Sequence, residues 1–117
     1  QDNFLTSDQY RFDRVYRLIC KKPALGVKGL SLGWIYEAVK RTNKFKEENW
    51  GVDVERPILL LNATQDRLVS PSGNVQILSR FKNSHIENID SKHEIFMESD
   101  SIRNQAWKKV DEFLANL

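Results

Sequence analysis

The chain has 117 residues, which is enough for one small domain with a modest core. Hydrophobic residues make up 40% and charged residues 29%, proportions typical of a soluble globular protein and not of a disordered one. The net charge is only +2 and the basic residues are scattered, so the sequence offers no argument for a nucleic-acid partner. No apolar run is long enough to cross a membrane.

A single cysteine, Cys20, cannot form an internal disulfide and is typical of a reducing, cytoplasmic compartment. Beside Leu18 and Ile19 it is expected to be a small buried apolar residue, not a nucleophile. No Cys/His spacing suggests zinc, and no cofactor is expected. No signal peptide is visible. The first residue is Gln1, which fits either removal of an upstream segment or trimming of the chain.

The first zone, roughly residues 6–46, is expected to be helical. Ser7 or Asp8 can cap a helix with apolar residues at helical spacing, namely Tyr10, Phe12, Val15, Tyr16 and Ile19. Proline and glycines interrupt residues 22–33. A second helix is expected from Ser31, with an apolar face made of Trp34, Ile35, Ala38 and Val39. Residues 44–55 are charged and predict a loop.

The second zone, from Arg56 onward, alternates strand and helix. Residues 58–63 form a short continuous apolar run, typical of a strand buried on both faces of a parallel sheet. A polar turn follows, and Ser70 with Pro71 predicts the start of a helix that carries Val75, Ile77, Leu78 and Phe81.

Residues 85–90 alternate between apolar and polar side chains and predict a second strand, with His85 at the surface. A loop over residues 91–97 leads to a last helix, which Asp100 can cap and which places Trp107 in the core. The order β-α-β-α predicts an α/β protein with an open parallel sheet.

Two ionisable residues follow the two predicted strands. Asp66 comes just after residues 58–63, and His93 comes just after residues 85–90. If the strands are parallel neighbours, both residues emerge at the carboxyl edge of the sheet, where functional groups gather in such folds. There a carboxylate can accept a bond from imidazole Nδ1–H and leave Nε2 free to take a proton from a serine hydroxyl. Taken alone, an aspartate in a turn or a histidine in a loop is usually structural.

The residues around this pair carry a resemblance. Residues 57–69 resemble the acid-bearing strand and loop of the lysophospholipase L2 and monoacylglycerol lipase group of α/β-hydrolases. Residues 91–100, with Arg103 and the closing Phe113-Leu114, are similar to the histidine loop and last helix of that group. Residues 3–34 are similar to the lid that these enzymes insert before the acid strand, so the resemblance covers almost the whole chain.

The resemblance implies the C-terminal part of an α/β-hydrolase fold. It divides the chain into a helical lid and linker, residues 1–55, and a C-terminal βαβα part of the core, residues 56–117. It implies that Asp66 is the triad acid and His93 the general base of a serine hydrolase that cleaves lysophospholipids, monoacylglycerols or other small esters. Peripheral contact with a membrane would suit such a substrate. Three further residues are expected to be structural: Asp100 as the helix cap, and Glu98 with Arg103 as an ion pair.

The nucleophile is missing from this picture. The family needs a serine on a G-x-S-x-G elbow between a buried strand and a helix. The one literal match is residues 29–33, with Ser31 at its centre, but the residues before it contain Pro23, lysines and Gly26 and make a poor strand. Ser31 is therefore expected to cap a lid helix, and the working serine is expected outside these residues.

A few parallel strands cannot cover a sheet by themselves. The chain is therefore expected to be a fragment that needs the missing half of the enzyme or self-association. The alternative is a catalytically inert fragment, or an accessory or binding domain built on a hydrolase-derived fold, because fold does not imply function.

Overall fold

A computed structural model describes residues 3–27, 29–47 and 50–117 of the chain. Helix α1 (Gln9–Lys21), the 3-10 turn η1 (Pro23–Leu25) and helix α2 (Leu32–Lys44) come first. Then follow β1 (Ile58–Ala63), α3 (Pro71–Leu78), β2 (Ser84–Ile89), the 3-10 turn η2 (Ile95–Met97) and α4 (Asp100–Ala115). The expected loops over residues 22–33 and 44–55 lie partly outside the described residues. The mixed α/β class is confirmed.

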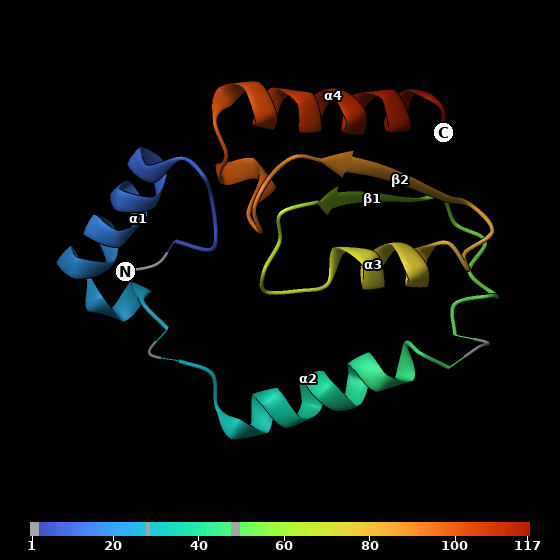
Figure 1. Ribbon diagram of the computed structural model, residues 1–117, viewed down its shortest axis with the longest axis horizontal. Coiled ribbons are helices and arrows are strands. Elements are labelled where there is room, and N and C mark those ends of the chain that lie inside the picture. Colours follow the sequence, from blue (N-terminus) through green and yellow to red (C-terminus); the bar gives the residue numbers. More distant parts are fainter. Residues whose placement is uncertain (1–2, 28, 48–49) are drawn as a thin grey trace.

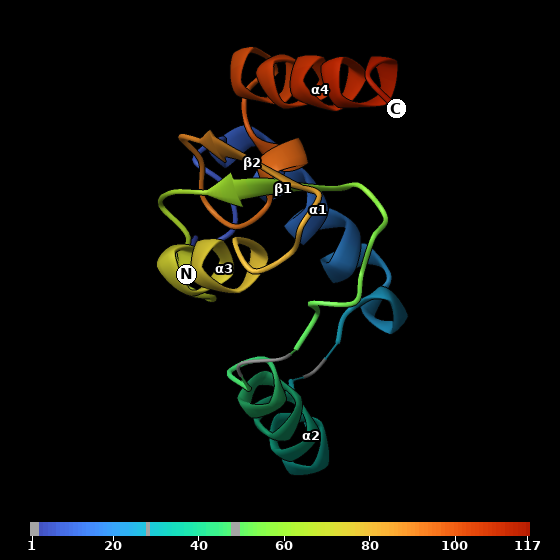
Figure 2. The ribbon, with the colours of Figure 1, turned by 90° about the vertical axis from the view of Figure 1, so that its right-hand side faces the viewer.

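The two strands form a small parallel sheet, as the order of elements predicts. Ile58 lies opposite Ser84 and Ala63 lies opposite Ile89. Helices α3 and α4 lie on opposite sides of the strands (Figures 1 and 2). Because the strands run the same way, the loops that follow β1 and β2 leave from one edge of the sheet.

The core is small and sits at the carboxyl end of the strands. Its buried members are Ala63, Ile89, Ile95 and Ala106, with Leu61 and Ile102 packed against them. The expectation that β1 is buried on both faces is met only at its last two residues, Asn62 and Ala63; the first four are half-buried. Among the described residues β1 pairs with β2 alone, so one of its edges is not covered by another strand.

Three helices begin at the caps that the sequence predicts. The side chains of Asp8, Ser31 and Ser70 accept hydrogen bonds from the backbone N–H three residues on, at 3.0, 3.1 and 3.1 Å. Each satisfies a donor that the first helical turn leaves without an intrahelical partner.

Several expectations about individual residues are wrong. The helix expected to carry Phe81 ends at Leu78, so Phe81 lies beyond it. Asp100 is the first residue of α4 and not its cap; Ser99, whose backbone is not yet helical, occupies that place. Cys20 is exposed, and α1 as a whole has no buried residue. Trp107 is 49% exposed and packs on the ring of Phe96 at the rim of the core, with the ring centroids 4.7 Å apart.

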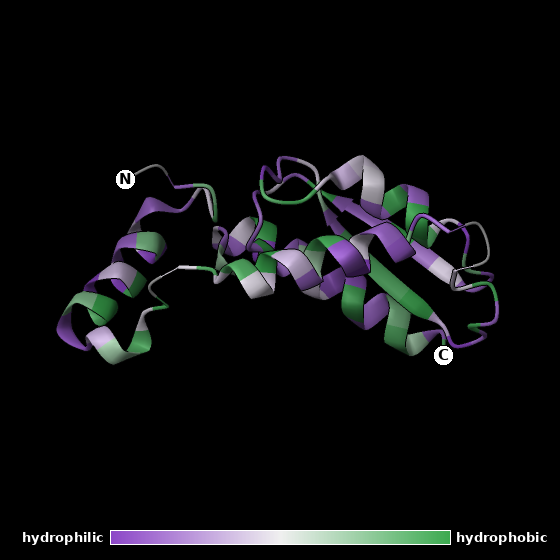
Figure 3. Cartoon of the chain, turned by 90° about the horizontal axis from the view of Figure 1, so that it is seen from below, coloured by the Kyte–Doolittle hydropathy of each residue, from purple (hydrophilic) through white to green (hydrophobic). Residues whose placement is uncertain are grey.

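The first zone projects from the sheet instead of covering it. Helix α2 stands away from the strands in both views (Figures 1 and 2). Hydrophobic and hydrophilic residues alternate along α1 and α2 (Figure 3), and large apolar side chains stay exposed there, among them Tyr10, Leu18, Trp34, Ile35 and Val39. None of the helices in the described residues is long and apolar enough to span a bilayer.

Candidate active site

Asp66 and His93 occupy the two loops at the carboxyl edge of the sheet. Asp66 lies in the turn after β1, and His93 lies in the loop between β2 and η2. Backbone hydrogen bonds continue the pairing of the strands into these loops, from Thr64 N to Ile89 O and from Gln65 N to Ser91 O, both at 2.9 Å. The two loops are therefore held side by side beyond the sheet.

The two side chains are in direct contact. His93 Nδ1 lies 2.7 Å from Asp66 Oδ2. An ionised carboxylate only accepts hydrogen bonds, so the proton belongs on Nδ1 and the lone pair of the neutral ring on Nε2. The Asp66 side chain is 5% exposed and that of His93 is 33% exposed. The imidazole is therefore accessible, while its carboxylate partner is enclosed.

Backbone donors hold the carboxylate of Asp66 in place. Its other oxygen, Oδ1, accepts from the N–H groups of Leu68 at 2.8 Å and Val69 at 3.1 Å. Burial by itself would raise the pKa of Asp66, but the hydrogen bond with His93 and these two amides outweigh it and lower the pKa. Asp66 is therefore ionised at neutral pH and suited to stabilise a protonated imidazole.

Glu98 is the residue whose role sequence reasoning missed. It does not pair with Arg103, whose guanidinium contacts Asp100 instead at 2.9 Å. Glu98 is fully buried, and its carboxylate accepts hydrogen bonds from Ser7 and from the backbone N–H of Lys92. Nothing local in the sequence indicates this contact, because Ser7 stands 91 positions away.

Comparison with known proteins yields a single line of support. A curated protein from Haemophilus influenzae, named probable lysophospholipase L2, is 30% identical over 116 residues. The match covers 96% of this chain and 36% of that protein. The chain thus spans about a third of the length of its relative. No family model and no solved structure matches the chain.

Ser31 caps α2, as expected, and takes no part in an elbow. Its Oγ accepts the Trp34 N–H at 3.1 Å, so the hydroxyl oxygen is engaged by its own helix. The described residues before it form η1 and an irregular stretch instead of a strand. A strand-to-helix turn is what strains and exposes a nucleophilic serine, and here the strand is absent from the described residues.

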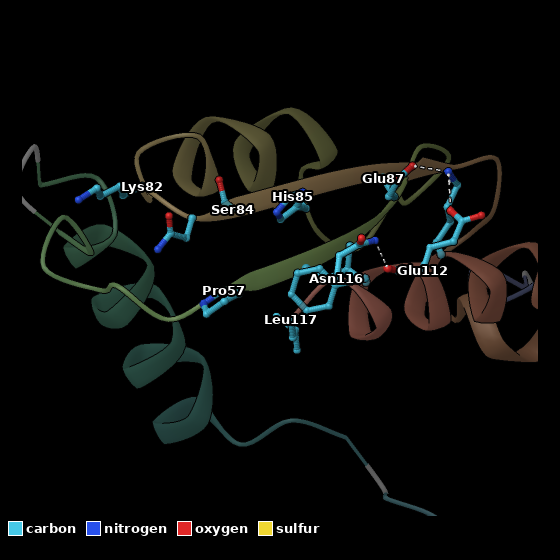
Figure 4. Close-up of a pocket in the computed structure, with 12 residues that line it drawn as sticks. Pro57, Lys82, Ser84, His85, Glu87, Glu112, Asn116 and Leu117 are labelled. Atoms are coloured by element: carbon cyan, nitrogen blue, oxygen red, sulfur yellow. Dashed lines mark hydrogen bonds and ion pairs between the residues drawn. The ribbon is translucent and has the colours of Figure 1, made fainter.

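A hollow of about 570 Å³ lies elsewhere, at the opposite end of the strands (Figure 4). Its walls come from the start of β1, from β2 as far as Glu87 and from the second half of α4, including Pro57, Ser84, His85 and Leu117. In open α/β sheets ligands bind beyond the carboxyl ends of the strands. The hollow is lined by neither Asp66 nor His93, which lie at the carboxyl edge, so it is separate from that pair.

Proposed function

We propose that this chain supplies the acid and the general base of a serine hydrolase that cleaves carboxylic esters of the lysophospholipid or monoacylglycerol class. The observation that carries the proposal is the 2.7 Å contact between His93 Nδ1 and the enclosed Asp66 carboxylate. The name of the Haemophilus relative, probable lysophospholipase L2, supports the choice of substrate class.

In the proposed mechanism, His93 Nε2 takes the proton of a serine hydroxyl while the serine oxygen attacks the ester carbonyl. Asp66 stabilises the imidazolium that forms and keeps the ring in the required tautomer. The imidazolium then gives its proton to the leaving alcohol. A water molecule, activated in the same way by His93, hydrolyses the acyl-serine.

We propose that the serine is contributed from outside these residues, since the one elbow-like sequence is a helix cap. We also propose that residues 1–55 form a lid and linker and that residues 56–117 belong to the hydrolase core. A cytoplasmic enzyme with peripheral contact to a membrane would reach such substrates. The exposed apolar residues of α2 are consistent with a lid.

The first test is hydrolysis of a lysophospholipid and of a monoacylglycerol by the complete protein that carries the serine. His93→Gln and Asp66→Asn should each lower kcat by about three to four orders of magnitude with little change in folding. Matched controls are His85→Gln and Asp90→Asn, which change the other histidine and an exposed aspartate just after β2. Full activity of both active-site variants would refute the proposed function.

The second test locates the nucleophile with a fluorophosphonate probe, which labels activated serines. The complete protein should be labelled at a serine outside these 117 residues, and Ser31→Ala should leave the labelling intact. Labelling of Ser31 itself would contradict the assignment. Absence of any labelling or hydrolysis in the complete protein would instead favour an inert or accessory domain.

A third expectation concerns the partner of the sheet. Each described strand pairs on one side only, and an unpaired strand edge exposes N–H and C=O groups that can pair with another chain. We propose that the rest of the hydrolase covers this edge, and that the chain by itself self-associates. Sedimentation of the purified chain checks this, and a stable monomer would count against it.

A further inference from the structure

The carboxylate of Glu98 lies at the meeting point of two segments that are far apart in sequence. Its exposed fraction is 0%. Oε1 accepts from the N–H of Lys92 at 3.0 Å, and both oxygens lie 3.0 Å from the N–H of Ser7. The hydroxyl of Ser7 also donates to Oε2. All of these donors are neutral groups, so directed hydrogen bonds, and not a positively charged partner, hold the carboxylate in place.

Within the loop that carries His93, residues 91–98 (the histidine loop), the bond from the Lys92 N–H to Glu98 closes a ring. The chain runs from Lys92 through His93 and η2 to Glu98, whose side chain returns to the N–H of Lys92. Two backbone bonds support the turn, from Met97 N to Glu94 O at 2.8 Å and from Glu98 N to Ile95 O at 3.2 Å. Lys92 directly precedes His93, so its amide is one residue away from the backbone that carries the imidazole.

The second segment, residues 3–7, lies against the outside of this ring. The hydroxyl of Thr6 donates to Met97 O at 2.9 Å, and the N–H of Glu94 donates to Leu5 O at 2.8 Å. Lys92 Nζ donates to Asn3 O at 2.8 Å. The Glu98 side chain binds Lys92 of the loop and Ser7 of the second segment at the same time. It therefore links the loop to residues 3–7.

The ionisation state of Glu98 fits this role. Burial raises its pKa, but the donors of Ser7 and Lys92 outweigh burial and lower the pKa below the ordinary value. The carboxylate is therefore charged at neutral pH, and its hydrogen bonds have the added strength of an ionised acceptor. A buried charge without these donors would be costly, so loss of either partner disturbs the whole loop.

We propose that Glu98 is a positioning residue for His93: its carboxylate ties the histidine loop to residues 3–7 and so sets the imidazole against Asp66. This inference rests on the proposed function, in which His93 is the general base. Glu98 itself stays out of contact with the reacting atoms and acts through the backbone of the loop.

The experiment compares Glu98→Ala and the nearly isosteric Glu98→Gln with Glu94→Ala and Glu94→Gln in the complete protein. Glu94 is an exposed carboxylate of the same loop, so it is a matched control for the chemical change. With 15N-labelled histidine, NMR reports the proton on His93 Nδ1, a direct signature of the bond to Asp66. The signal is assigned by its loss in His93→Gln, and folding is checked by circular dichroism.

We expect the Nδ1–H signal to shift or broaden in Glu98→Ala and kcat to fall about 10- to 100-fold with KM unchanged, since a misplaced catalytic group lowers the rate without weakening binding. Glu98→Gln keeps one acceptor oxygen and should fall between Glu98→Ala and the wild type. It also carries the test if Glu98→Ala fails to fold. The Glu94 variants should match the wild type.

An unchanged Nδ1–H signal and an unchanged kcat in folded Glu98→Gln would overturn the positioning role. Failure of the proposed function has a different pattern, because His93→Gln and Asp66→Asn would then leave hydrolysis unchanged. In that case the NMR comparison still reports whether Glu98 sets the contact between His93 and Asp66.

Discussion

Two anchors tie the ends of the first zone to the strands, and they use opposite chemistry. At the amino end, residues 3–11 reach the histidine loop through polar contacts, with Glu98 at the centre and Arg11 donating to the Glu98 carbonyl oxygen at 2.7 Å. At the other end, the aromatic rings of Phe45, Trp50 and Phe81 form a cluster, with centroids 4.4 and 5.4 Å apart. The polar anchor adjoins the candidate site, whereas the aromatic one lies at the amino end of β2.

The difference matters because the two kinds of contact tolerate change differently. Hydrogen bonds to a buried carboxylate depend on direction and on pH, and they cost free energy when one partner is removed. Apolar contacts are non-directional and depend on volume. The polar anchor is therefore suited to fix the geometry of His93, and the aromatic one to supply stability. Helix α2 lies between the anchors and away from the sheet (Figure 1).

The largest expected effect is loss of the aromatic anchor. Phe81 is 8% exposed, and Phe81→Ala should lower the free energy of unfolding by about 3–5 kcal/mol, because it removes a buried ring and leaves a cavity. Denaturant titration measures the loss. Phe96→Ala, which removes a 43% exposed ring, is the matched control and should cost much less. Equal losses of unfolding free energy in the two variants would show that the buried Phe81 ring contributes no more to stability than the exposed Phe96 ring.

A smaller loss is expected from crowding the same anchor. Gly51 has φ +83°, and a Cβ there would lie 2.4 Å from Cζ of Phe81. Gly51→Ala should therefore cost about 1–3 kcal/mol, from both the backbone conformation and overpacking. Gly29 has φ +130° with no atom within 4 Å of an added Cβ, so Gly29→Ala isolates the backbone part. If the two variants lose the same stability, the contact with Phe81 contributes nothing.

The polar anchor should show itself in the pH dependence of stability. Because the pKa of Glu98 is lowered in the folded state, the unfolded chain binds more protons between the native and the unfolded pKa. The contribution of Glu98 is therefore fully present above the unfolded pKa, about 4.5, and is lost as pH falls through the lower native pKa. Denaturant titrations at several pH values between about 6 and 3 give the free energy of unfolding as a function of pH. Its slope should be shallower for Glu98→Gln than for Glu94→Gln. Identical slopes would contradict this account.

The smallest effect is expected between the anchors. Ser31→Ala removes the cap of α2 and should cost about 0.5–1 kcal/mol, detected as lost helicity in α2 by circular dichroism or hydrogen exchange. Because α2 stands away from the sheet, the proposed hydrolysis should be unchanged. A large loss of activity with the fold preserved would place Ser31 in the chemistry after all.

The sequence by itself determined the local elements and the two residues of the candidate site. The apolar run after Pro57 predicts β1 at its observed bounds, and Ser7 or Asp8, Ser31 and Ser70 predict three of the helix starts. These signals are local, because strand burial and capping depend on neighbouring residues. The contact of Asp66 with His93 could also be expected, because two parallel strands bring their following loops to one edge. Their catalytic role remains a proposal.

Only the tertiary structure decided what surrounds that pair. The partners of Glu98, the pairing of Arg103 with Asp100 and the exposure of Cys20 and Trp107 depend on segments that meet after folding. The resemblance to the hydrolase group implied an ion pair between Glu98 and Arg103, yet the buried Glu98 carboxylate accepts from backbone and hydroxyl donors instead. The physical reason is that a buried carboxylate must find donors wherever the fold supplies them, and here the fold supplied Ser7 and Lys92.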